Sequence, residues 1–160
     1  MEEPMSRVQL ALNVSDLDDA IAFYSKLFGS QPAKVRPGYA NFSIEQPPLK
    51  LVLIEDATRE PGTLNHLGVE VETREEVAEA VARLQTQGLP TAVEDEVACC
   101  YALQDKVWVD GPGGEAWEIY TVLADVEMPN GELRPADDAA PACCDTRPDL
   151  APPANAAPCC

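Results

Sequence analysis

The chain has 160 residues, of which 28 are acidic and 11 are basic, so its formal net charge is −17. That length fits one domain with an extension, and the acidity argues against a nucleic-acid partner, because binding phosphates needs clustered lysine and arginine. No apolar run is long enough to span a bilayer, and the first ten residues lack the basic and apolar regions of a signal peptide. We therefore expect a cytoplasmic protein that does not bind membranes.

The first half of the chain predicts a strand, a helix and three short strands. Apolar and polar residues alternate over residues 8–14, which is typical of a half-buried strand. Ser15, with Asp18 three residues on, predicts the start of the helix, and Gly29 predicts its end. Strands are expected at 33–35, 40–44 and 49–55, separated by Pro-Gly and Pro-Pro. Four apolar residues recur at helical spacing between the caps: Leu17, Ile21, Tyr24 and Phe28.

The second half repeats this order of elements. A strand is expected at 66–71, followed by a helix that begins at Thr73, with Glu76 three residues on, and ends at Gly88. Val77, Val81 and Leu84 give this helix its apolar spacing, and further strands are expected at 91–97, 101–109 and 115–123.

The two halves together predict an α+β fold built from two βαβββ modules. "VQLALNVSDLDDAIAFYSKLFG" can be aligned with "NHLGVEVETREEVAEAVARLQTQG". Two such modules, at about 5–56 and 64–124, can pair into one curved mixed sheet that encloses a cleft. The domain is therefore expected to cover residues 5–124.

Composition changes after this domain. Residues 125–160 are rich in proline, alanine and aspartate and contain almost no large apolar side chains. Such a segment buries too little surface to offset its ordering entropy, so we expect a disordered acidic tail. It is either a low-complexity extension with incidental cysteines or a flexible tether that raises the local concentration of thiols near the cleft.

Three side chains are candidate metal ligands. In the alignment of the halves Gln9 falls on His66, the only histidine of the chain. A lone histidine in a strand is more often structural than a ligand, but its relation to a second ligand-capable residue changes that balance. Glu118 lies in an alternating strand and is either exposed or directed into the cleft. Together they would form an open three-ligand face for a divalent metal.

All six cysteines occur as adjacent pairs: Cys99-Cys100, Cys143-Cys144 and Cys159-Cys160. Cytoplasmic thiols stay reduced, so this pattern favours capture of a soft ion over cross-linking. Cys99 and Cys100 follow the polar stretch "VEDEVA", which makes two buried apolar residues the weaker interpretation. Neighbouring side chains of a regular strand point to opposite faces, so we expect this pair in a loop or at an irregular strand start.

Other residues have weaker claims to a role in the site. Tyr101, Lys106 and Trp108 lie near the thiols in sequence, and Trp108 is expected in the core. Tyr39 and Phe42 either line the cleft or pack. The run Gly-Pro-Gly-Gly lacks the spacing of a phosphate-binding loop and is interpreted as a turn.

The doubled βαβββ arrangement resembles the vicinal oxygen chelate superfamily, which includes glyoxalases, extradiol dioxygenases and bleomycin-resistance proteins. Within it, "PGYANFSIEQPPLKLVLIE", "LNHLGVEVE" and "CCYALQDKVWVDGPGGEAWEIY" look like organoarsenical C–As lyases. Those proteins are non-haem iron dioxygenases and are similar to cadmium-induced proteins. The resemblance covers residues 5–123, nearly all of the part expected to be ordered.

The resemblance implies Fe(II) held by Gln9, His66 and Glu118, and an organoarsenical bound by Cys99 and Cys100. It implies O₂-dependent cleavage of the C–As bond of trivalent organoarsenicals such as methylarsonous acid or trivalent aromatic arsenicals, giving inorganic As(III). Glutamine departs from the usual two-histidine, one-carboxylate set, and its amide oxygen is a weaker donor.

Two alternatives remain open beside this activity. One is a thiol-rich protein that sequesters arsenic or cadmium without turnover, and the other is a different activity of the superfamily, such as isomerisation or drug sequestration. A pure thiol trap would not need Gln9, His66 and Glu118, and the other activities would leave Cys99 and Cys100 unexplained. Small molecules are the expected partners, and a homodimer is left open.

Overall fold

The computed structural model describes residues 6–99 and 101–126. In this part of the chain eight strands form one sheet in the order β2-β3-β4-β1-β5-β8-β7-β6, with two helices. Their bounds are β1 Arg7–Val14, α1 Leu17–Phe28, β2 Lys34–Arg36, β3 Tyr39–Ile44, β4 Leu49–Glu55, β5 Leu64–Glu70, α2 Arg74–Thr86, β6 Ala92–Cys99, β7 Ala102–Asp110 and β8 Ala116–Asp125.

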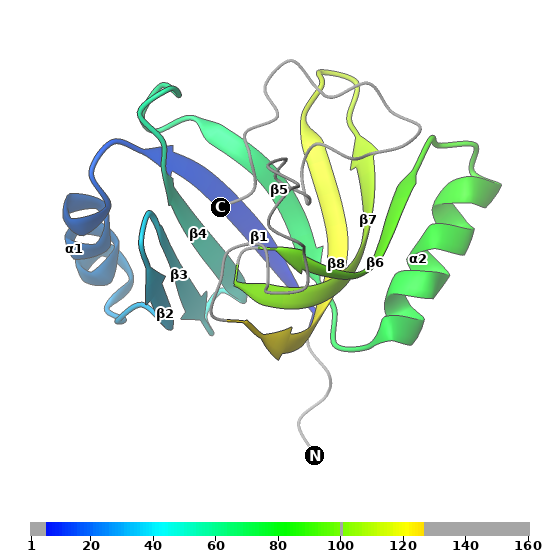
Figure 1. Ribbon diagram of the computed structural model, residues 1–160, viewed down its shortest axis with the longest axis horizontal. Coiled ribbons are helices and arrows are strands. Elements are labelled where there is room, and N and C mark those ends of the chain that lie inside the picture. Colours follow the sequence, from blue (N-terminus) through cyan, green and yellow to red (C-terminus); the bar gives the residue numbers. More distant parts are fainter. Residues whose placement is uncertain (1–5, 100, 127–160) are drawn as a thin grey trace, which may run out of the picture.

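The predicted pair of βαβββ modules is confirmed. The first module runs from β1 to β4 and the second from β5 to β8, and each carries its helix directly after its first strand. Within a module the first and last strands pair in parallel, β1 with β4 and β5 with β8. The modules join through the antiparallel pair of β1 and β5. Figure 1 shows α1 and α2 at opposite outer sides of the curved sheet.

The register between the modules agrees with the sequence repeat. Leu10 of β1 lies opposite Leu67 of β5, and the alignment of the halves also equates these two residues. The modules are therefore related by an approximate twofold axis near this pair. Gln9 and His66 lie symmetrically about it, opposite Gly68 and Ala11 respectively. Strand alternation places their side chains on the same face of the sheet.

Helix α1 begins one residue later than predicted. Its N-cap is Asp16, not Ser15, and the Asp16 carboxylate accepts a hydrogen bond of 2.9 Å from the backbone N–H of Asp19. Both residue types cap helices well, and here the aspartate is the one with its oxygen in reach of the third helical N–H. Gly29 ends the helix with φ +63°, as predicted.

Helix α2 has the predicted capping box. The Thr73 side chain accepts from the N–H of Glu76, and the Glu76 carboxylate accepts from the N–H of Thr73. Gly88 follows the helix with φ +75°. Both modules thus place a well-capped helix between their first two strands.

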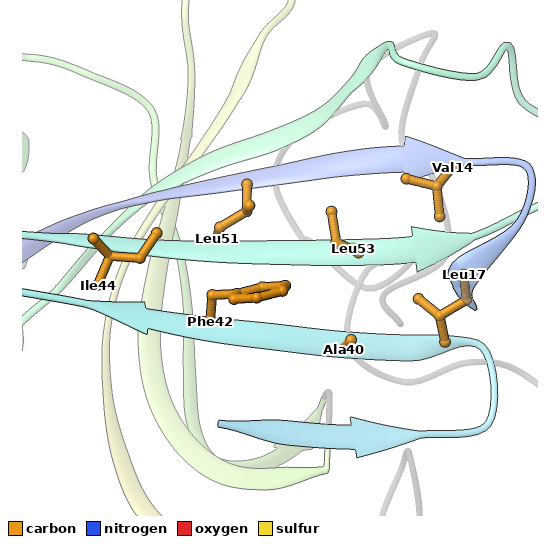
Figure 2. Packing of buried hydrophobic residues seen from close by; sticks show 7 residues of the cluster. All are labelled: Val14, Leu17, Ala40, Phe42, Ile44, Leu51 and Leu53. Carbon is orange, nitrogen blue, oxygen red and sulfur yellow. The ribbon is translucent and has the colours of Figure 1, made fainter. Parts of the chain in front are cut away.

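The core of the first module lies between α1 and the outer face of β3 and β4. Phe42, Leu51 and Leu53 are buried there, each contributing about 1.5–3 kcal/mol to stability. Alternate residues of β4 face the other way, so Lys50, Val52 and Ile54 lie on the concave inner face. The seven buried residues of this outer cluster, drawn in Figure 2, are Val14, Leu17, Ala40, Phe42, Ile44, Leu51 and Leu53.

Strand β8 runs to Asp125, whose carboxylate forms an ion pair of 2.6 Å with Lys34. The rest of the predicted tail, from residue 127, lies outside the described residues, as do its two cysteine pairs. In the described ranges, α1 with 12 residues and α2 with 13 are both too short to cross a membrane.

Candidate functional site

The structure brings Gln9, His66 and Glu118 together on the concave face. They come from β1, β5 and β8, which are neighbours at the centre of the sheet. Gln9 Nε2 lies 3.1 Å from His66 Nε2 and 2.8 Å from Glu118 Oε1. His66 Nε2 and Glu118 Oε1 are 3.4 Å apart. Each residue is at most 4% exposed. Glu118 is therefore directed inward, the second of the two interpretations that its strand allowed.

Gly68 makes room for this arrangement. It pairs with Gln9 on one side and with Glu118 on the other. A Cβ at position 68 would lie 3.1 Å from both Gln9 Nε2 and Glu118 Cγ, which is closer than most real contacts of this kind. The absent side chain thus leaves space where the three polar groups meet.

Neighbouring amides fix the tautomer of His66. Its Nδ1 lies 2.8 Å from Asn65 Oδ1, an oxygen that can only accept a hydrogen bond. Asn65 is itself held by a bond of 2.9 Å from its Nδ2 to Asn13 Oδ1. Nδ1 therefore carries the proton, and the lone pair of Nε2 faces Gln9 and Glu118. A histidine oriented in this way is ready to bind a metal.

The amide of Gln9 lies the opposite way round from the expected ligand geometry. Its nitrogen faces His66 and Glu118, whereas its oxygen accepts a hydrogen bond from the Tyr120 hydroxyl. The expectation that the oxygen faces the site does not hold for this arrangement. The two ends of a carboxamide have nearly the same size, so turning the amide requires only an exchange of hydrogen bonds.

Lys106 is a buried counter-ion of Glu118. Its Nζ lies 2.7 Å from Glu118 Oε2, and the residue is 1% exposed. The ammonium also lies 5.3 Å and 5.7 Å from the ring centroids of Trp108 and Tyr120. Burial alone would raise the pKa of Glu118, but attraction to Lys106 outweighs it and holds this pKa well below its usual range. Glu118 is therefore an ionised carboxylate.

Tyr120 links Gln9 to a group of charged residues. Its hydroxyl contacts Gln9 Oε1 and lies 2.9 Å from Glu70 Oε2. Glu70 in turn pairs with Lys50 and Arg7, at 2.9 Å each. Burial, followed by the Glu70 and Glu118 carboxylates, raises the pKa of Tyr120 well above its ordinary value, so the hydroxyl keeps its proton.

The outer end of this group reaches the surface. Arg7 and Glu70 line a pocket of about 990 Å³. Sequence reasoning missed the roles of Tyr120 and Glu70, and it named Lys106 only as a weak candidate near the thiols, not as the partner of Glu118. For Tyr120 a signal was available, since it shares a strand face with Glu118 two residues away.

The donor set fits a divalent metal ion. It offers one imidazole nitrogen, one carboxylate oxygen and, with the amide turned, one carboxamide oxygen, a mixture that suits borderline divalent ions. Within residues 6–99 and 101–126, no three histidine, cysteine, aspartate or glutamate side chains gather as a metal site. A three-ligand site on this face therefore depends on Gln9.

Cys99 lies in a strand, contrary to the expectation of a loop or an irregular strand start. It is the last residue of β6, pairs with Ala102 and is fully buried. Its carbonyl accepts a hydrogen bond of 3.1 Å from Gln104 Nε2. The strand extends as far as Cys99 because the backbone groups of Cys99 find partners in Ala102 and Gln104. Cys100 lies outside the described residues.

An apolar wall flanks the polar site on the side of the first module. We use this name for the buried residues Ala11, Tyr39, Val52, Ile54 and Tyr101. Tyr101 lies in a turn directly before β7 with φ +61°, and its ring centroid lies 5.5 Å from that of Tyr39. Tyr39 thus belongs to the inner face, whereas Phe42 packs under α1. Ala11 is two residues from Gln9 on the same strand face, so the wall adjoins the site.

Comparisons with known proteins agree with this fold. The model of the glyoxalase/bleomycin resistance protein/dioxygenase superfamily matches residues 7–119. A trivalent organoarsenical cleaving enzyme of Thermomonospora curvata is 60% identical over 143 residues, which cover 89% of this chain and 91% of that one. The cadmium-induced protein CadI of Mycobacterium bovis is 58% identical over 144 residues, covering 88% and 94%.

A solved structure of Mn(II)-bound glyoxalase from Novosphingobium aromaticivorans shares the fold. Its TM-score is 0.55 at 19% identity, and the match covers 76% of this chain and 42% of that one. The fold of this chain is therefore similar to that of a protein solved with Mn(II) bound.

Proposed function

Because the chain belongs to the glyoxalase/bleomycin resistance protein/dioxygenase superfamily, we propose that it is an Fe(II)- and O₂-dependent C–As lyase. Its substrates are trivalent organoarsenicals such as methylarsonous acid and trivalent aromatic arsenicals, and its product is inorganic As(III). The observation that carries the proposal is the convergence of Gln9, His66 and Glu118 on the concave face. The high identity to an organoarsenical cleaving enzyme supports the choice of substrate.

Each side chain of the site has a role in this proposal. His66 offers the lone pair of Nε2, Glu118 offers a negative oxygen, and Gln9 offers its carboxamide oxygen. Lys106 holds the other oxygen of Glu118, so that one oxygen stays directed to the metal position. Iron held by these three residues would supply the redox chemistry for the reaction of O₂ with the substrate.

The substrate is held by thiols and by the apolar wall. Trivalent arsenic is soft and binds thiolates, and a monosubstituted arsenical has two bonds for Cys99 and Cys100. A cytoplasmic location would keep these thiols reduced. The methyl or aryl group fits the apolar wall, because that surface adjoins Gln9 and carries Val52 and Ile54.

The proposed reaction is balanced without an external reductant. Methylarsonous acid plus one O₂ contains the same atoms as formaldehyde plus arsenous acid. The C–As bond breaks, carbon is oxidised, O₂ is reduced, and arsenic remains trivalent. Formaldehyde is therefore the expected carbon product from the methyl substrate.

The test of function is an oxygen-triggered single turnover. Full-length protein is loaded with Fe(II) and methylarsonous acid under anaerobic conditions, and O₂ is then admitted. We expect inorganic As(III) and an equal amount of formaldehyde, with neither formed when iron or O₂ is left out. Methylarsenical that stays bound and unchanged after O₂ is admitted would instead favour the second candidate.

That second candidate is sequestration of arsenic or cadmium by thiols without turnover. Its support is the high identity to a protein described as cadmium-induced. It predicts capture of the metal or metalloid with no dependence on Gln9, His66 and Glu118. Ion capture that is unchanged by iron, by O₂ and by loss of His66 would favour it.

Replacing either thiol of the pair tests how the substrate is held. Cys99→Ser and Cys100→Ser are each expected to lose capture of methylarsonous acid, because one thiolate cannot close the chelate. Both variants should keep iron, since neither residue is assigned as an iron ligand. Equilibrium dialysis under reducing conditions measures both quantities. Undiminished arsenical affinity in both variants would contradict the chelate.

A further inference from the structure

The Tyr120 hydroxyl lies between two hydrogen-bond acceptors. Gln9 Oε1 is on one side and Glu70 Oε2, at 2.9 Å, is on the other. A phenolic hydroxyl has a single proton to donate, although its oxygen can also accept a hydrogen bond. In this arrangement Gln9 and Glu70 compete for that proton, and one of them is left without it.

Glu70 is the stronger competitor. Its carboxylate is fixed by Arg7 and Lys50, each at 2.9 Å, and an ionised carboxylate can only accept hydrogen bonds. Hydrogen bonds to charged acceptors are roughly twice as strong as those to neutral ones. The proton of Tyr120 is therefore best placed toward Glu70, which leaves a lone pair of the hydroxyl oxygen facing Gln9.

That lone pair favours the amide N–H of Gln9 as its partner. Turning the amide places Nε2 against Tyr120 and brings Oε1 to the position beside His66 Nε2 and Glu118 Oε1. The His66 lone pair already faces this point, because Nδ1 donates to Asn65. Three acceptor atoms then face one another at a position whose neighbouring groups lie 2.8–3.4 Å apart, and a cation satisfies all three.

We propose that Tyr120 is a positioning residue that directs the Gln9 carboxamide oxygen to the metal, with Glu70 setting the direction of the Tyr120 proton. The inference rests on the metal assignment under Proposed function and adds residues that act through a ligand rather than touching the metal. It gives the Arg7–Glu70–Lys50 group a role in a site that none of its members contacts.

The experiment measures Mn(II) affinity, with Mn(II) as a redox-stable probe. Free Mn(II) is followed by electron paramagnetic resonance while it is titrated into full-length protein. We expect Tyr120→Phe to weaken Mn(II) binding by about tenfold or more, as is typical when the partner of a metal ligand is lost. Tyr39→Phe is the matched control, because Tyr39 is equally buried on the same face but its hydroxyl bonds Asn41. Its affinity should stay within about twofold of wild type.

A second background separates positioning from general damage. Gln9→Glu presents an oxygen whichever way the side chain turns, so the metal no longer depends on Tyr120 to choose the correct end. In that background we expect Tyr120→Phe to change Mn(II) affinity by no more than about twofold. The proposal is overturned if Tyr120→Phe lowers Mn(II) affinity equally in the wild-type and Gln9→Glu backgrounds. It is also overturned if the single variant Tyr120→Phe binds Mn(II) as tightly as wild type.

The remaining outcomes distinguish this inference from the function on which it rests. If wild type binds no Mn(II), or if His66→Ala binds it equally well, the metal assignment fails and this inference fails with it. If His66→Ala loses the ion but Tyr120→Phe does not, only the positioning role is overturned. Should Tyr120→Phe fail to fold, Glu70→Gln takes its place. We expect Glu70→Gln to weaken Mn(II) binding by about tenfold or more when Gln9 is present and by no more than about twofold in the Gln9→Glu background.

Discussion

Replacing His66 with alanine is expected to abolish iron binding and all O₂-dependent release of As(III), while the fold stays intact. His66 is the only imidazole of the chain. Without it the site keeps one carboxylate and one carboxamide, a set too weak to hold Fe(II) against water. The ring lies on the inner face, edge-on to Trp108 at 5.5 Å, so its loss leaves the cores under the helices untouched.

Iron stoichiometry after anaerobic dialysis and single-turnover release of As(III) measure this effect. Far-ultraviolet circular dichroism checks that the sheet is retained, and Tyr39→Phe serves as the control with full iron occupancy. Stoichiometric iron together with full turnover in His66→Ala would show that the metal site lies elsewhere.

Replacing Lys106 with methionine is expected to destabilise the metal-free protein by about 3–5 kcal/mol. The cause is Glu118, which is 3% exposed and loses its ammonium partner at 2.7 Å, so that a buried carboxyl is left without its counter-ion. Methionine fills a similar volume, so a cavity contributes little. The free energy of unfolding is measured by urea denaturation of metal-free protein at neutral pH.

Two further variants show whether the buried charge of Glu118 causes the loss of stability in Lys106→Met. Lys34→Met removes an ammonium whose partner Asp125 is 73% exposed, and should cost about 1 kcal/mol or less. The double variant Lys106→Met/Glu118→Gln, which removes both charges, should be more stable than Lys106→Met alone. If Lys106→Met lowers the free energy of unfolding no more than Lys34→Met does, the stabilising role assigned to the Lys106–Glu118 pair is contradicted.

The sequence predicted those features that depend on local periodicity. Strand alternation allowed Glu118 to be directed into the cleft, and the capping box fixed the start of α2 at Thr73. The repeat related Gln9 to His66, and the observed β1–β5 register agrees with that alignment. These features were predictable because each depends on a residue and its near neighbours in the chain.

Features that depend on contacts across the sheet could not be predicted in this way. Lys106 reaches Glu118, and Tyr120 reaches both Gln9 and Glu70, through the register of β1, β5, β7 and β8. No local pattern specifies these partners. The start of α1 was wrong by one residue because Ser15 and Asp16 are both good caps. Cys99 was expected outside a regular strand because neighbouring side chains of a strand point to opposite faces, but backbone pairing of β6 with β7 keeps it in the strand.

The approximate twofold relation between the modules also has an evolutionary meaning. Leu51 lies beside Leu10 and Trp117 lies beside Leu67, so the counterpart of Glu118 in the first module is the next residue of β4, Val52. A duplicated ancestor with equal halves would carry like residues at both positions. In this protein the position in the first module holds valine, which belongs to the apolar wall, and the position in the second module holds an acid. The two related positions thus differ in chemistry, with an aliphatic side chain in one module and a carboxylate paired with Lys106 in the other.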